Sequence, residues 1–365
     1  MFFGILSFLI WPILIIGVIG YFVRRNKKSG HPATDTEWYL QFALSKEDAV
    51  SQLFLLLSVF FFGVTLLAFN KNIGDPFSWR IILFITSVLA LLIAYYFKAL
   101  YSLAVGLMGV TGWWGAQAAE WMQGKDIKTS VMVAGLAFIA LLLYVLGHLH
   151  EKEIKWKRFA LVYLILGIIP ITGALFFFSS KPGLSELGAM TKGALFISSW
   201  QITTSLVIFL AALVGVMLAA AAKRLLSFFE CLAVLGLMLV FGAIALLPEQ
   251  HLFLQQAGNH YDRFYSGGQA LSNSGVLWAV MFNVLAFFEL LGLIFSAYSR
   301  RETWLINLGA LFLFLRIIMK YFDWFFTFLD KSIFFIGAGI LLVALGWFME
   351  KGRRLMISTI TPHGQ

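Results

Sequence analysis

The sequence predicts an all-α fold, a polytopic bundle of about eleven transmembrane helices. Three observations lead to this prediction. Of the 365 residues, 61% are hydrophobic and only 12% are charged, whereas a soluble domain has about half and a quarter. The apolar residues gather in runs long enough to cross a hydrocarbon layer of ~30 Å as helices. None of these runs alternates between apolar and polar residues as a barrel strand does.

The predicted helices follow one another along the chain, and no connection is long enough to hold a soluble domain. They cover residues 2–23, 53–69, 81–97, 101–119, 131–149, 159–178, 202–222, 225–247, 276–298, 303–322 and 332–349. In the fourth of them glycines recur every three residues from Gly106 to Gly115, a spacing that favours close approach of a neighbouring helix. We therefore expect residues 1–365 to form a single integral membrane domain.

The basic residues indicate how the helices are oriented. The connections 24–50, 98–100, 151–158, 223–224, 299–302 and 350–354 hold 17 of the 27 lysines and arginines. Since cytoplasmic connections carry the excess of Lys and Arg, these connections are predicted to be cytoplasmic. The N-terminus is then outside and the C-terminus is cytoplasmic, an arrangement that needs an odd number of spans. We expect a multi-pass protein of the inner cell membrane.

Composition and motifs exclude several classes of protein. The net charge of +9 lies in short connections at helix ends, so topology explains it and no nucleic acid partner is expected. The single cysteine, Cys231, rules out an internal disulfide and a cysteine-based zinc site. No phosphate-binding loop, zinc-protease motif or serine-hydrolase motif occurs, so no catalytic residue and no cofactor is predicted. The expected partners are membrane lipids, with other membrane proteins as further candidates.

A few charged residues lie within the predicted spans, where an ionisable group is expensive and raises a functional hypothesis. Glu289 lies about 13 Å from the inner boundary, and Arg316 about 20 Å from it, at 1.5 Å per residue. A pair between them on adjacent helices is within reach. Lys320 and Asp323 share the Arg316 face of the helix at i+4 and i+7. Glu230 lies nearer the inner end of its helix.

Two interpretations of these charges stay open. Glu289, Arg316, Lys320 and Asp323 form either an outward-opening polar pocket or a structural clasp. The pocket would bind an anionic headgroup, a phosphate or a coupling proton. The clasp is one buried ion pair, with Lys320 and Asp323 extending to water.

Histidines give weaker signals. The outer connection 248–275 contains His251, His260 and Asp262, which are candidates for contact with a substrate. Their spacing matches no metal-ligand pattern, and no metal site is predicted. His148 and His150 close a helix at the membrane surface and point in nearly opposite directions, as interfacial polar residues do.

The last two helices carry a family resemblance. Arg316-Ile-Ile-Met-Lys320-Tyr-Phe-Asp323 is followed by a long apolar helix that ends in Glu350 and basic residues. This pattern resembles a family of bacterial inner-membrane proteins catalogued as a domain of unknown function. In that family an arginine precedes Tyr-Phe-Asp, where this chain has Lys320. The resemblance implies a bacterial multi-pass protein and supplies no catalytic residues.

These observations leave three functional hypotheses. The first is transport or binding of a lipid or small solute through a polar site in the C-terminal helices. The second is a structural or regulatory membrane subunit that acts through partner proteins. The third is a membrane enzyme on lipid-linked substrates that uses the outer connection 248–275. The intramembrane charges and the missing catalytic motifs favour the first hypothesis and argue against an enzyme.

Overall fold

A computed structural model describes residues 46–151, 156–246, 248–249, 251–253, 271–300, 302–325 and 331–360. Within these ranges the backbone forms eleven α-helices and one short 3₁₀ turn, and it forms no β-strand. An all-α fold is therefore confirmed. The predicted first helix, residues 2–23, lies outside the described residues.

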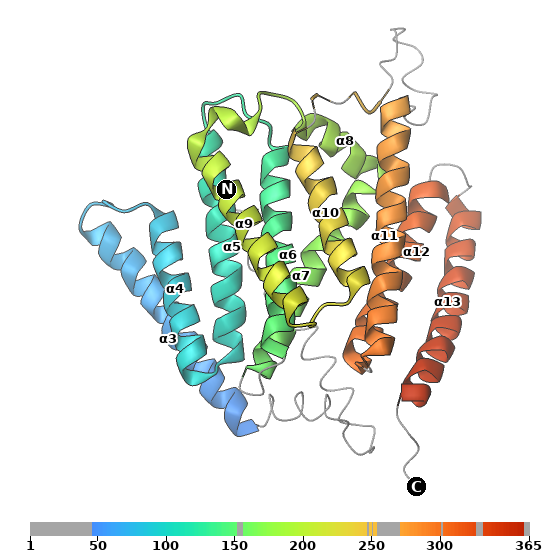
Figure 1. The fold of residues 1–365 in the computed structure, drawn as a ribbon, viewed down its shortest axis with the longest axis horizontal. Helices are drawn as coiled ribbons and strands as arrows, with labels where there is room; N and C mark the ends of the chain where they lie inside the picture. The colour runs from blue at the N-terminus through green and yellow to red at the C-terminus, as the bar shows by residue number, and fades with distance from the viewer. Residues whose placement is uncertain are drawn as a thin grey trace. The chain divides into compact units, whose positions relative to one another are not determined.

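The helices follow the predicted order (Figure 1). They are α3 (Lys46–Asn72), α4 (Trp79–Phe97), α5 (Leu100–Met122), α6 (Ser130–Glu151), α7 (Lys157–Phe178), α8 (Lys181–Met190), the 3₁₀ turn η1 (Phe196–Ser198), α9 (Trp200–Ala222), α10 (Phe228–Leu246), α11 (Asn273–Ser299), α12 (Thr303–Phe325) and α13 (Lys331–Ile360). Each predicted span from 53–69 onward coincides with one of these helices. Only α8 and η1, which lie in the predicted connection 179–201, were not expected.

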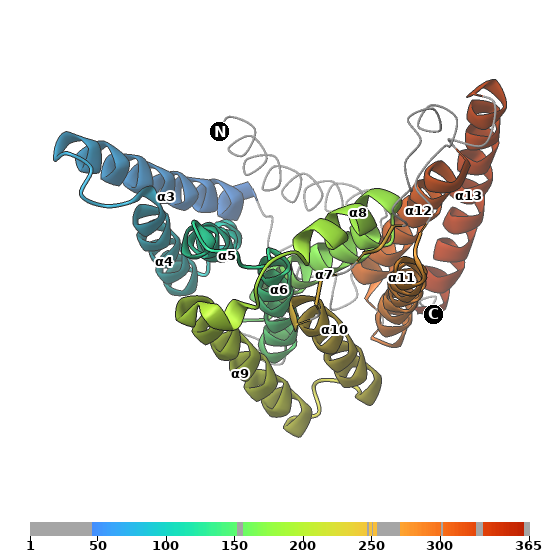
Figure 2. The same ribbon diagram turned by 90° about the horizontal axis from the view of Figure 1, so that it is seen from above.

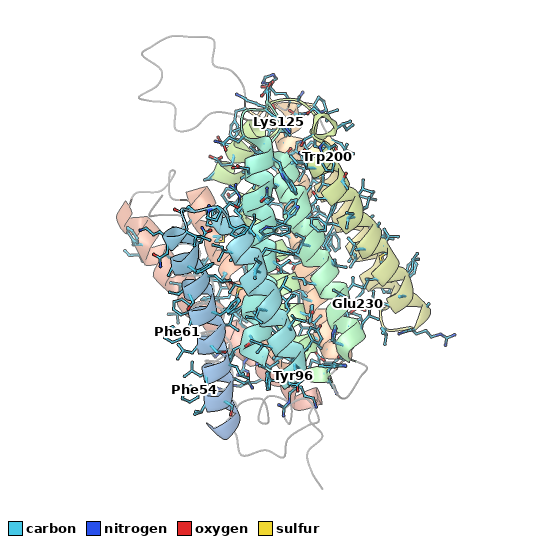
Figure 3. All side chains as sticks on the ribbon, turned by 90° about the vertical axis from the view of Figure 1, so that its left-hand side faces the viewer. Phe54, Phe61, Tyr96, Lys125, Trp200 and Glu230 are labelled. Atoms are coloured by element: carbon cyan, nitrogen blue, oxygen red, sulfur yellow. The ribbon has the colours of Figure 1, made fainter. Side chains whose placement is uncertain are left out.

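Nine of the described helices are long and apolar enough to cross a membrane. These are α3, α4, α6, α7, α9, α10, α11, α12 and α13. Helix α5 has the length of a span, but its glycines and tryptophans lower its mean hydropathy and it is not among the nine. Phe54 and Phe61 point away from α3 (Figure 3), as lipid-facing side chains do. The chain is thus a multi-pass membrane protein.

The chain divides into two compact units. The first comprises Met1–Glu120 and Leu143–Leu166. Within it α3 packs against α4, and α5 packs against α4 through its glycines. A Cβ added at Gly106 would lie 2.8 Å from the Leu91 side chain, and one added at Gly109 would collide with Ser87. This part of the glycine repeat is therefore a packing surface, as the spacing predicts.

The second unit comprises Trp121–Leu142 and Gly167–Gln365. Helix α12 packs against both α11 and α13, and these three helices lie side by side in both ribbon views (Figures 1 and 2). Buried aromatic rings join α7 to α11, where the Phe178 and Phe282 ring centroids lie 5.4 Å apart. Trp278 extends this contact by stacking on Phe282 at 5.6 Å. The polar residues described below lie beside these rings.

Basic connections gather at one end of the second unit. The α9–α10 and α11–α12 connections and the C-terminal end of α13 lie at the same end (Figure 1), and they carry Lys223, Arg224, Arg300 and the basic residues of 351–354. Such clustering is the pattern that the positive-inside rule requires. The side of the membrane on which this end lies stays a prediction.

Candidate functional site

Two polar residues lie on one side of the apolar C-terminal half of α7, one within the helix and one directly after it. Thr172 and Ser179 are seven residues apart, with Phe176 between them, so all three lie on one side of α7 and at its end. Thr172 is fully buried and Ser179 is nearly so. In a membrane-spanning segment, buried hydroxyls at such positions hydrogen-bond across to neighbouring helices. Here the neighbours are α11 and α12.

Glu289 of α11 contacts the N-terminal part of this face, at Thr172. The Thr172 hydroxyl donates a hydrogen bond to Glu289 Oε1 at 2.5 Å. The other carboxyl oxygen, Oε2, is buried and has no hydrogen-bond partner in the described structure. A buried carboxyl oxygen without a partner is unusual, because leaving such an atom unsatisfied is costly.

Ser179 is the meeting point of three side chains from α11 and α12. Its carbonyl oxygen accepts a hydrogen bond from Lys320 Nζ at 2.6 Å and another from Asn283 Nδ2 at 3.4 Å. Its hydroxyl contacts Arg316 Nη1. Because Ser179 directly follows the last residue of α7, its carbonyl lies at the negative end of the helix dipole, where a lysine ammonium is stabilising.

Arg316 is held on several sides. Its Nη2 donates to Asn283 Oδ1 at 2.6 Å, and its guanidinium lies over the Phe176 ring at 5.3 Å from the centroid. The residue is only 8% exposed. A planar guanidinium that is hydrogen-bonded at its edge and stacked on a ring has a fixed orientation. The structure therefore places an oriented arginine at the C-terminal end of α7.

The expected ion pair between Glu289 and Arg316 is not formed, so the clasp interpretation is wrong in this respect. Glu289 bonds to Thr172, while Arg316 contacts Ser179 and Asn283. Thr172 and Ser179 are about 10 Å apart along α7 at 1.5 Å per residue. Each charged group thus has a separate hydroxyl partner on this side of α7. The positions of the two charges along α11 and α12 could not predict this, because they carry no information about α7.

A break between α7 and α8 shapes this end of the site. Ser180 caps α8 by accepting a hydrogen bond from the Gly183 amide at 3.2 Å, and Pro182 follows in the first turn. A side chain at Gly183 would collide with the Phe177 carbonyl, so only glycine fits there. The tight turn leaves the Ser179 carbonyl accessible to Lys320.

Glu230 lies elsewhere, at the N-terminus of α10. It accepts a hydrogen bond from the Ser227 amide at 2.8 Å, and the Ser227 hydroxyl accepts one from the Glu230 amide at 3.2 Å, which is a capping box. Arg300, just after α11, pairs with the same carboxylate at 2.9 Å, and Ser296 donates to it at 2.8 Å. These contacts tie α10 to the end of α11.

The remaining predicted site residues are not brought into this cluster by the described contacts. The His251 carbonyl accepts hydrogen bonds from Ser272 at 2.6 Å and Ser274 at 3.1 Å. His260 and Asp262 lie outside the described residues, and so does the side chain of Asp323. In the parts of the chain that the structure describes, no group of three His, Cys, Asp or Glu residues could hold a metal ion.

The first unit contains a polar cluster that the sequence did not indicate. The Tyr95 hydroxyl lies 2.7 Å from the Tyr163 hydroxyl and 3.1 Å from His150 Nε2. The His150 ring stacks on Tyr163 with centroids 4.7 Å apart, and its Nδ1 lies 2.8 Å from the Leu146 carbonyl. Since a carbonyl can only accept, Nδ1 carries a hydrogen, and in the neutral ring Nε2 then accepts from the Tyr95 hydroxyl. His150 is thus an anchored partner of two tyrosines.

Sequence reasoning found the charged residues of the candidate site and missed its neutral ones. Thr172, Ser179 and Asn283 carry no charge, and neutral polar residues are common in membrane helices. The available signal was their position, because each lies in or directly beside an apolar run.

Comparisons with known proteins add no relative. No family model, curated protein or solved structure matches the chain. The resemblance of the C-terminal helices stays a prediction, and functional inference rests on the site itself.

Proposed function

We propose that this membrane protein binds, and moves across the bilayer, a lipid or small solute that carries an anionic group. The binding site is formed by Arg316, Lys320, Asn283 and the end of α7. One observation carries the proposal: Arg316 is buried in a membrane helix but is not neutralised by Glu289, the acid on the facing helix. Ionisable residues within membrane helices commonly mark ligand or ion pathways, and Asn283, Ser179 and the Phe176 ring hold this arginine in one orientation.

The chemistry of the cluster favours a phosphate or a carboxylate as the bound group. A guanidinium presents a rigid fork of N–H donors that matches either group in a bidentate manner. Lys320 lies one helical turn further along α12 and adds a second cation on the same face. Asn283 and Ser179 supply uncharged polar groups that orient the bound molecule.

The end of α7 supports the same function. The Ser179 carbonyl, just after the last residue of this span, accepts hydrogen bonds from Lys320 and Asn283. The Ser179 hydroxyl contacts Arg316, so one residue at the end of the helix gathers both cations of the proposed site.

Native mass spectrometry of the protein released from nanodiscs tests this proposal. The nanodiscs contain phosphatidylcholine with phosphatidylglycerol in one arm, and phosphatidylcholine with added inorganic phosphate in the other. We compare wild type with Arg316→Gln and with Arg354→Gln, which removes the same charge from a side chain that is 75% exposed. We expect an adduct in wild type and Arg354→Gln that is lost in Arg316→Gln. The arm in which it occurs distinguishes a lipid headgroup from a free anion.

A second variant keeps the test decisive if Arg316→Gln fails to fold. Arg316→Lys retains the charge but loses the planar fork, so we expect a folded protein whose adduct is weakened. If the wild-type protein shows no adduct in either arm, the proposal is contradicted and a structural subunit is favoured. An adduct that is equally retained in folded Arg316→Gln would also contradict it.

A further inference from the structure

Glu289 has a feature that an anion site does not require. Its Oε1 accepts the Thr172 hydroxyl, but its buried Oε2 has no partner. Burying an ionised carboxylate is very expensive, and each unsatisfied buried oxygen adds to the cost. A hydrogen on Oε2 would remove the charge. Loading and releasing protons is one of the recurring roles of acidic residues within membrane helices.

We propose that Glu289 is a proton-exchange site and that the protein moves its anionic ligand together with a proton. This inference rests on the proposed function, because the anion is the one bound by Arg316 and Lys320. The step is a simple protonation in which a proton from water adds to Oε2 and is released to water later. No covalent bond to the ligand is formed and no electron is transferred.

Few charged groups on the neighbouring helices would compete with the bound anion in its effect on Glu289. Helix α7 contributes no titratable residue between Gly167 and Phe178, and Glu289 is the only charged residue of α11. Helix α12 contributes Arg316 and Lys320, with Asp323 further along it. The other neighbours of α11 are α8, with exposed Lys181 and Glu186, and α10, with Glu230 and Cys231 at its far end.

Coulomb's law gives the expected strength of the coupling between the bound anion and the proton on Glu289. Thr172, which contacts Glu289, and Ser179, which contacts Arg316, are about 10 Å apart along the chain. At that distance, in an effective dielectric constant of about 20, the Glu289 carboxylate and a bound anion of unit charge weaken each other's binding roughly 15-fold. A bound anion disfavours a second negative charge at Glu289. Anion and proton therefore promote each other's binding, and the pair crosses the membrane with less net charge than the anion alone.

Infrared difference spectroscopy detects the proton without reference to the anion. A protonated carboxyl has a carbonyl stretch that shifts in heavy water, and its intensity is followed from mildly acidic to mildly alkaline pH. We expect a titrating band in wild type that is absent in Glu289→Gln and retained in Glu186→Gln, which alters an exposed acid. A wild-type difference spectrum identical to that of Glu289→Gln would refute the inference.

A binding measurement then tests the coupling. With inorganic phosphate or phosphatidylglycerol as the probe, we expect wild type to bind about 15-fold more tightly at acidic than at alkaline pH, beyond the change from the probe's own ionisation. Glu289→Gln, a permanently neutral side chain, should bind tightly at both. Equal pH dependence in the two proteins would overturn the coupling.

The two proposals fail in different ways. In Arg316→Gln we expect the carboxyl band to persist while probe binding is lost. If no probe binds to wild type, the anion site fails, and with it the coupling, although a titrating Glu289 band would still show proton exchange. If the probe binds through Arg316 and no band titrates, only the proton inference fails.

Discussion

The substitution Ser179→Ala tests whether the end of α7 holds Arg316. It removes the hydroxyl that contacts Arg316 and leaves the backbone carbonyl that accepts Lys320. Hydrogen bonds between membrane helices contribute about 0.6 kcal/mol on average and at most about 1.7. Because the partner here is a buried guanidinium, and bonds to charged groups lie at the upper end, we expect a loss of about 1.5 kcal/mol in the free energy of unfolding.

The assay is reversible unfolding in mixed micelles with increasing amounts of a denaturing detergent. Ser58→Ala is the matched control, because the Ser58 hydroxyl is exposed and bonds only within its own helix, to the Leu55 carbonyl at 2.7 Å. That variant should remain within about 0.5 kcal/mol of wild type. Equal stability of Ser179→Ala and Ser58→Ala would refute the assignment of Ser179 as the residue that positions Arg316.

A double-mutant cycle separates the contact from general damage to the helix end. If Ser179 and Arg316 interact, the double variant Ser179→Ala/Arg316→Gln should be more stable than the sum of the single effects predicts, by about 1 kcal/mol. Strict additivity would indicate that the two residues act independently. We also expect Ser179→Ala to weaken phosphate or phosphatidylglycerol binding, since the guanidinium loses one of its contacts.

Two further predictions concern the first unit, and the same unfolding assay checks both. Gly109→Ala places a methyl group against Ser87 and should cost about 1–3 kcal/mol. Gly115→Ala meets open space and should cost nothing, so equal losses would contradict the assigned packing surface. Tyr95→Phe removes the hydroxyl that joins a tyrosine and a histidine and should cost about 1 kcal/mol. Tyr96→Phe alters an 81% exposed ring and serves as the control, and a loss as large as that of Tyr95→Phe would contradict the prediction.

The sequence predicted most of the fold because each membrane helix is specified locally. A run of about 20 apolar residues is sufficient to indicate a span, and α9 and α11 begin and end within a few residues of the predicted bounds. Helix α8 was not predicted, because ten residues that begin Lys181-Pro182-Gly183 form no apolar run. Its capping by Ser180 is a local signal that could have indicated it.

The candidate site was predicted less completely, since it depends on which helices lie together. Charge alone singled out Glu289 and Arg316, and both contribute to the polar face along α7. Their partners could not be read from the sequence, because Thr172 and Ser179 belong to a helix more than a hundred residues away. A threonine or serine in an apolar run becomes a site residue only when another helix brings a charged side chain against it. A charged residue in such a run can be recognised from the sequence alone.

Pro170 gives α7 a mechanical property. It lies within the helix, two residues before Thr172, and it lacks the amide hydrogen that would bond to the preceding turn. Helices bend at such positions. Both the contact to Glu289 and the contact to Arg316 are made by residues that follow Pro170. A change in the bend of α7 at Pro170 would therefore move both contacts together.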